Sequence, residues 1–211
     1  MIVKTFTFNP FQENTFILHD ETNEAVIIDA GCFNDGEKRL IKHYFEENKL
    51  SLKRLINTHL HLDHQFGNKF IFDAFGVAPE AGQEDEFLLG NVAAQALSFG
   101  LPFNEEAQPL SAYIVENQEI KFGNSSLMAI HVPGHSPGSM AFYSEKDGVL
   151  FAGDVLFQGS IGRTDLVKGD YATLISSITK KLLPLPDSTV VYCGHGPTTT
   201  IGNEKKNNPY L

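Results

Sequence analysis

The chain has 211 residues, a formal net charge of -10 and 42% hydrophobic residues. This length can bury one sizeable core, and the composition is that of an ordinary globular protein. The negative charge argues against a nucleic-acid partner and against an anionic membrane surface, because both attract basic side chains. We therefore expect a single domain over 1–211 that acts on a small molecule, without nucleic acid or membrane, as a monomer or a homodimer.

The N-terminal residues and the cysteines bear on the compartment. Residues 2–8 alternate between apolar and polar side chains, which predicts a strand and not the apolar core of a signal peptide. The two cysteines, Cys32 and Cys193, are too few for a disulfide framework. A cytoplasmic location is the resulting prediction. Cys193 is interpreted as a buried apolar residue, with a thiol near a functional site as the alternative.

Strands and helices are predicted in turn along the chain. Periodicity and turn residues predict strands at 2–8, 15–19, 25–28, 52–57, 113–116, 119–123, 126–132, 139–144, 148–152 and 189–193, and helices at 36–48, 67–75 and 171–183. Each half contains strands followed by a helix, which favours an α+β fold with two sheets and helices outside them.

Residues 80–110 predict a helical insertion between the two halves. Acidic residues at 84–86 suit the N-terminus of a helix, where the helix dipole is positive. Apolar residues follow at helical spacing from Leu88 to Ala96. This insertion is expected either to form one wall of a substrate pocket or simply to pack on the core.

The densest chemistry in the sequence follows the predicted strand 52–57. The segment Thr58-His59-Leu60-His61-Leu62-Asp63-His64 places three imidazoles and a carboxylate within seven residues. Loops at strand ends commonly carry functional groups because a rigid sheet braces them. The segment therefore predicts a metal site.

Three single residues extend this prediction, since each stands where a predicted strand ends. His135 lies in a Pro-Gly-His turn, Asp154 follows an apolar strand, and His195 follows the last core strand. Asp29 also ends a strand, and we expect it to brace the ligand loops by hydrogen bonds. His131, His19 and His43 are not expected to bind metal, and the latter two are predicted to be solvated.

This pattern resembles the metallo-β-lactamase-fold hydrolases, and within them the short glyoxalase II-like branch. The resemblance covers essentially the whole chain and rests on Asp29, Gly31, the HxHxDH motif at 59–64, His135, Asp154 and His195. It implies a four-layer αββα sandwich of two mixed β-sheets with helices on the outer faces. It also implies one metal ion on His59, His61 and His135, and a second ion on Asp63, His64 and His195. Asp154 would bridge the two ions, and Asp63 and Asp154 would be the catalytic carboxylates.

The implied activity is hydrolysis of a thioester of the hydroxyacylglutathione type, by attack of a metal-bridging hydroxide on the acyl carbonyl. Two divalent metal ions are expected, and zinc is the metal expected first. Imidazole and carboxylate ligands also suit iron or manganese. Arg163 could bind a substrate carboxylate as a bidentate fork, or it could pair with Asp165. The chain ends 16 residues after His195, so the resemblance does not reach the C-terminal helical domain with which full-length glyoxalase II enzymes bind glutathione.

Three other activities compete with this interpretation. A persulfide dioxygenase-like oxidoreductase would use a single iron on His59, His135 and Asp154, and a lactonase would use the same site as the hydrolase. A class B β-lactamase is disfavoured because those sites lack the bridging carboxylate that Asp154 supplies.

Overall fold

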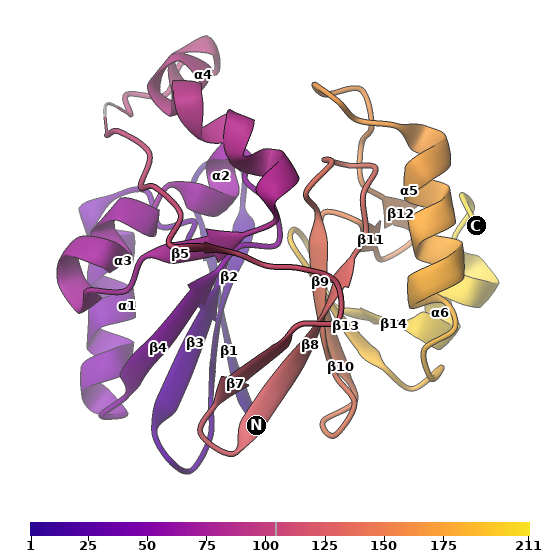
Figure 1. The fold of residues 1–211 in the computed structure, drawn as a ribbon, viewed down its shortest axis with the longest axis horizontal. Coiled ribbons are helices and arrows are strands. Elements are labelled where there is room, and N and C mark those ends of the chain that lie inside the picture. Colours follow the sequence, from indigo (N-terminus) through magenta and orange to yellow (C-terminus); the bar gives the residue numbers. More distant parts are fainter. Residues whose placement is uncertain (104) are drawn as a thin grey trace.

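The computed structural model describes residues 1–103 and 105–211, and it contains two six-stranded β-sheets packed face to face (Figure 1). The first sheet has the strand order β1-β2-β3-β4-β5-β6. Its strands are β1 (Ile2–Phe8), β2 (Glu13–His19), β3 (Glu24–Ile28), β4 (Ser51–Ile56), β5 (Pro79–Ala81) and β6 (Ala112–Tyr113). It is a mixed sheet, because β1 to β3 pair antiparallel and β3 to β6 pair parallel.

The second sheet has the order β14-β13-β10-β9-β8-β7. Its strands are β7 (Glu119–Phe122), β8 (Ser125–His131), β9 (Met140–Ser144), β10 (Val149–Gly153), β13 (Val190–Cys193) and β14 (Thr199–Thr200). Only β10 and β13 pair parallel in this sheet. A separate hairpin is formed by β11 (Leu156–Phe157) and β12 (Ser160–Ile161).

Helices cover the outer faces of both sheets (Figure 1). On the N-terminal half these are α1 (Asp35–Glu47) and α3 (Asn68–Phe75). The short helix α2 (Leu62–Gln65) packs with α4 (Val92–Ser98), which lies above the sheet in Figure 1, and a 3-10 helix, η1 (Gln83–Asn91), precedes α4. On the C-terminal half they are α5 (Tyr171–Ser177), its π-helical continuation η2 (Ile178–Leu182) and α6 (Ile201–Asn207). The predicted αββα sandwich is therefore confirmed. None of the helices in the described part of the chain has the length and hydropathy of a membrane span.

Three apolar clusters hold these layers together. The cluster between the sheets includes Phe16 and Ile28 from the first sheet and Phe142 and Phe151 from the second. A second cluster packs β2, β3 and β4 against α1 and α3, and a third packs β9, β10 and β13 against α5, η2 and α6. Burial of apolar surface on both faces of each sheet gives the scaffold its rigidity.

Most predicted elements are present, with several differences. The strand expected at 113–116 is only the two-residue β6, and the helix expected at 171–183 changes from α to π geometry after Ser177. The insertion predicted at 80–110 contains η1 and α4, and its residue 104 lies outside the described residues. His19 is only 6% exposed, because its ring packs beside Tyr44 and its Nε2 lies 2.9 Å from the hydroxyl of Tyr44, so the prediction of a solvated His19 was wrong. His43 is exposed, as expected, and pairs with Glu47.

Candidate metal centre

Four loops at one edge of the sandwich carry the predicted ligands. His59, His61, Asp63 and His64 follow β4 of the first sheet, and α2 begins at Leu62. His135 follows β8, Asp154 follows β10, and His195 follows β13, all in the second sheet. Because the carboxyl ends of parallel strands meet at one edge of a sheet, β10 and β13 deliver Asp154 and His195 side by side.

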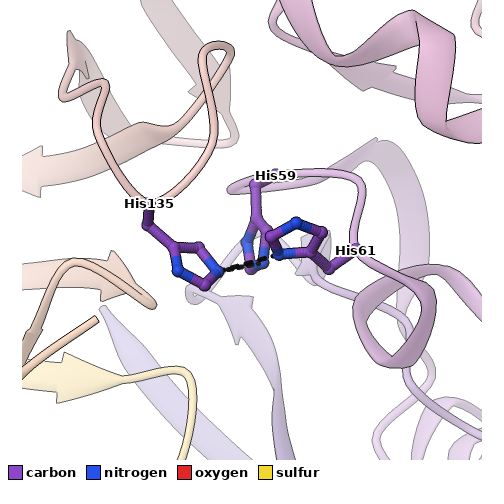
Figure 2. A group of neighbouring side chains, drawn as sticks. All are labelled: His59, His61 and His135. Carbon is purple, nitrogen blue, oxygen red and sulfur yellow. Dashed lines mark hydrogen bonds between the residues drawn. The ribbon is translucent and has the colours of Figure 1, made fainter. Parts of the chain in front are cut away.

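The first group of donors is His59, His61 and His135 (Figure 2). The Nδ1 atom of His61 lies 2.8 Å from Nε2 of His135, and that Nε2 lies 3.2 Å from Nε2 of His59. Figure 2 shows the three rings converging from two separate loops. Three imidazole nitrogens that face one another form a site for a divalent cation.

The second group is Asp63, His64 and His195. Oδ2 of Asp63 lies 3.1 Å from Nε2 of His195 and 3.8 Å from Nε2 of His64. Asp154 lies between the two groups, since its Oδ2 is 3.7 Å from Nε2 of His135 and 3.5 Å from Nε2 of His195. Its Oδ1 is 3.5 Å from Nε2 of His64. All seven predicted ligands are thus brought together.

The outer nitrogen of each of four histidines is tied to an oxygen acceptor. Nδ1 of His59 lies 3.1 Å from the hydroxyl of Thr58, and Nδ1 of His64 lies 2.9 Å from Oδ2 of Asp29. Such contacts fix the orientation of each ring and leave Nε2 for a metal ion.

The same arrangement holds for the two histidines from the second sheet. Nδ1 of His135 lies 2.8 Å from the carbonyl oxygen of Arg163, and Nδ1 of His195 lies 3.0 Å from that of Phe11. His61 differs, because it directs Nδ1 into the group.

Unpaired polar atoms support a metal at this position. Nε2 of His64 and Oδ1 of Asp154 are buried and have no hydrogen-bond partner among the described residues. Buried polar atoms without partners are costly, so such atoms in a polar cluster need a ligand. The donor set therefore fits two divalent ions, one on each group, with the Asp154 carboxylate facing both.

Electrostatics differ between the two groups. Burial and the neighbouring imidazoles of His135 and His64 lower the pKa of His61 to about 3, so its ring is neutral and ready to bind a cation. Burial alone would lower the pKa of His195, but the carboxylates of Asp154 and Asp63 outweigh it and raise that pKa to about 10. Without metal, the second group therefore holds a proton that a metal ion must displace.

Asp29 performs the bracing that was expected of it. Its carboxylate is fully buried and accepts hydrogen bonds from the backbone N–H and hydroxyl of Thr58, each at 2.7 Å, besides facing His64. It thereby joins the end of β3 to the loop that carries His59.

The other residues considered from the sequence lie beside the centre. His131 is directed away, because its Nε2 lies 2.8 Å from the carbonyl oxygen of Pro137. Cys193 is buried, and burial raises the pKa of its thiol to about 12, as expected of an inert cysteine. The guanidinium of Arg163 is 62% exposed and forms a bidentate ion pair with Asp165 at 2.7 and 2.8 Å.

Two functional residues were not identified from the sequence. Glu13 is fully buried, and its carboxyl group lies in one cluster with Asp29 and His64. Asp85, interpreted as a helix-opening acid, is also fully buried and accepts hydrogen bonds from two ligand loops. Neither stands in a motif, and Asp85 lies between two exposed acids, Glu84 and Glu86, so the sequence does not distinguish it from them.

Comparison with known proteins is consistent with this geometry. Residues 8–195 match the model of the metallo-β-lactamase superfamily. The protein belongs to this superfamily. It is 42% identical over 212 residues to the hydroxyacylglutathione hydrolase GloC of Haemophilus influenzae, with 100% of this chain and 98% of that protein covered.

Two solved structures share the fold over their full length. The structure titled BLEG-1 B3 metallo-β-lactamase has a TM-score of 0.89 and 36% identity, covering 100% of this chain and 99% of that one. The di-iron-bound form of TTHA1623 has a TM-score of 0.87 and 34% identity, covering 99% and 100%. The protein is accordingly a metallo-hydrolase of the superfamily with a His/Asp metal site.

Proposed function

We propose that the protein is a binuclear metal-dependent hydrolase of thioesters of the hydroxyacylglutathione type. The observation that carries the proposal is the position of Asp154, whose carboxylate faces a nitrogen of His135 in one group and of His195 in the other. The identity of 42% to GloC over the full length supports the substrate class. Zinc is the metal proposed first, and the di-iron form of TTHA1623 makes iron the main alternative.

The bound ions would supply the chemistry that side chains lack, lowering the pKa of water from about 15.7 towards about 7 and polarising the acyl carbonyl. The residues of the chain hold and orient this centre. His59, His61 and His135 would supply imidazole nitrogens, and the carboxylates of Asp63 and Asp154 would offset the positive charge. The rigid loops fix the donors before substrate arrives, which spares reorganisation during the reaction.

Arg163 is proposed to bind a carboxylate of the substrate. Its backbone carbonyl contacts His135, so its side chain starts from the rim of the first group. The ion pair with Asp165 is exposed and therefore weak, so a substrate carboxylate can replace it.

The proposal is tested by preparing metal-free protein, adding zinc, iron or manganese, and assaying hydrolysis of S-lactoylglutathione. We expect activity only in the presence of metal, and its loss in the H61A variant. The matched control is H43A, which removes an exposed histidine outside the site. Full activity of the metal-free protein or of H61A would overturn the proposal.

β-Lactam hydrolysis was disfavoured from the sequence, but it becomes the second candidate because the BLEG-1 structure, at 36% identity, is that of a B3 metallo-β-lactamase. A chromogenic cephalosporin assayed on the same preparations distinguishes the two. Turnover of the cephalosporin without turnover of the thioester would favour this second function.

A further inference from the structure

Asp85 lies in η1, outside the proposed ligand set, and its side chain is fully buried. Its carboxylate accepts three hydrogen bonds. Oδ2 accepts from the backbone N–H of Leu60 at 3.2 Å and from the hydroxyl of Ser136 at 2.6 Å, and Oδ1 accepts from the N–H of Gly138 at 2.6 Å. A buried carboxylate with several donors is a strong structural link, because each charge-assisted bond is stronger than a neutral one.

These three donors belong to two different ligand loops. Leu60 stands between His59 and His61 in the loop after β4 of the first sheet. Ser136 directly follows His135 in the loop after β8 of the second sheet. One carboxylate therefore ties together the two loops whose imidazoles form the first donor group (Figure 2).

The loop that carries Gly138 packs closely against Asp85 and the start of η1. A Cβ atom on Gly138 would lie 2.7 Å from Cγ of Asp85, and one on Gly82 would lie 2.3 Å from the carbonyl oxygen of Gly138. Leu60 and Leu88 belong to an apolar cluster beside it. Buried polar contacts that are fully satisfied in such surroundings hold one geometry, and they are costly to break.

Asp29 offers a comparison on the other side of the centre. It contacts His64 directly and so orients a ligand of the second group, whereas Asp85 bonds only to the residues beside His59, His61 and His135. Asp29 also braces the His59 loop through Thr58, but of these two buried carboxylates it is Asp85 that joins this loop to the loop carrying His135.

We propose that Asp85 is a positioning residue that sets the spacing of the three imidazoles of the first metal group. This inference rests on the proposed binuclear centre. It assigns to η1 the role of holding one metal ion in place from outside the ligand set.

The test is a titration of metal-free D85N with Co²⁺, followed by its visible absorption and by competition with a chelator. Asparagine keeps the shape of aspartate but replaces one acceptor oxygen with an N–H donor, so at least one of the three bonds is lost. We expect the first group to bind Co²⁺ about 10- to 100-fold more weakly, the usual effect of removing a residue that supports ligands. The second group should bind as in the unaltered protein.

Reference variants identify the two binding steps. In H61A the first group is disrupted, so its spectrum shows Co²⁺ bound to the second group. In H195A the second group is disrupted, so its spectrum shows Co²⁺ bound to the first group. E84Q is the matched control, because it removes an exposed carboxylate from the same helix. S136A removes a single donor to Asp85 and should weaken the first step in the same direction, so it carries the test if D85N does not fold.

Unchanged affinity of both steps in D85N and S136A would overturn the inference. Equal weakening of both steps would also overturn it, because that result indicates a general structural role. If the unaltered protein binds fewer than two Co²⁺ ions, the proposed binuclear centre itself has failed.

Discussion

Oδ2 of Asp29 lies 2.9 Å from Nδ1 of His64, and both side chains are completely buried. The contact turns Nε2 of His64 towards Asp63 and Asp154, so Asp29 determines which nitrogen is offered to the second metal. Asp29 also adopts φ of +53°, a left-handed conformation that aspartate and asparagine tolerate better than most residues.

D29N tests this contact with a side chain of the same size, and asparagine accepts the same φ. The amide is a weaker acceptor for the imidazole and can place its N–H₂ group against Nδ1. We expect the second metal to bind about 10- to 100-fold more weakly, and thioester turnover to fall with it. Chelator competition measures the affinity, and D73N, which alters an exposed aspartate on α3, is the control. Equal metal affinities of D29N and D73N would contradict this role.

Metal binding should release a proton from the second group. The pKa of His195 is raised to about 10 in the metal-free protein, so at pH 7 its ring is protonated and must lose the proton when a cation binds. The affinity of this group should therefore rise as the pH rises from 6 to 9. Calorimetry in two buffers of different ionisation enthalpy measures the proton.

H61A is the comparison for this measurement, because the pKa of His61 is lowered to about 3 and its ring carries no proton at pH 7. The variant should lose the first metal and keep the proton release of the second. Buffer-independent heats in the unaltered protein would contradict the assignment.

Asp20 gives a prediction about stability far from the metal centre. It accepts hydrogen bonds from Thr22, Asn124 and Ser125, which join the β2–β3 turn to the β7–β8 turn. Burial alone would raise the pKa of Asp20, but these bonds outweigh it and lower the pKa from 3.8 to about 2. The stabilisation is therefore present above pH 4 and is lost as the pH falls through about 2.

D20N should lower the free energy of unfolding at pH 7 by about 2 kcal/mol, which is the free-energy equivalent of the lowered pKa of Asp20. The difference from the unaltered protein should shrink towards pH 2. Urea unfolding at several pH values measures it, with D187N, an exposed aspartate, as the control. A difference that stays constant down to pH 2 would argue against the ionised Asp20 as its source.

Ionisation of Glu13 should change the stability with pH in the direction opposite to that of Asp20. Burial raises its pKa well above 4.5, and its Oε1 has no hydrogen-bond partner among the described residues. The folded metal-free protein thus keeps a proton that the unfolded chain releases above pH 4.5, so this group lowers stability as the pH rises. E13Q should remove this loss of stability at high pH. The melting temperature of E13Q should be above that of the unaltered metal-free protein, and the difference should be larger at pH 8 than at pH 5. Parallel melting curves, as expected for the exposed control E84Q, would contradict the buried neutral form.

The sequence predicted the two-sheet architecture, and it predicted which histidines and aspartates come together in one cluster, because both depend on local signals. His59, His135, Asp154 and His195 each stand where an apolar strand meets a turn, and a rigid sheet edge brings such residues together. Asp29 was expected to brace the loops for the same reason.

The missed features depend on contacts between distant segments. The sequence alone predicts that Asp85 is an acid at a helix N-terminus, and its burial depends on the loops that contain Leu60 and Ser136. His19 is predicted to be an exposed strand end, and its burial depends on Tyr44 from α1. The two-residue strands β12 and β14 exist only because a neighbouring strand pairs with each of them, so no periodicity in the sequence predicts them.

The most direct test of the binuclear hydrolase is the rate of S-lactoylglutathione hydrolysis by metal-free protein as Zn²⁺ is added in increments. We expect a rate that rises until two equivalents of Zn²⁺ per chain are bound and then stays constant. Full activity after one equivalent, or no thioester hydrolysis after two, would contradict it.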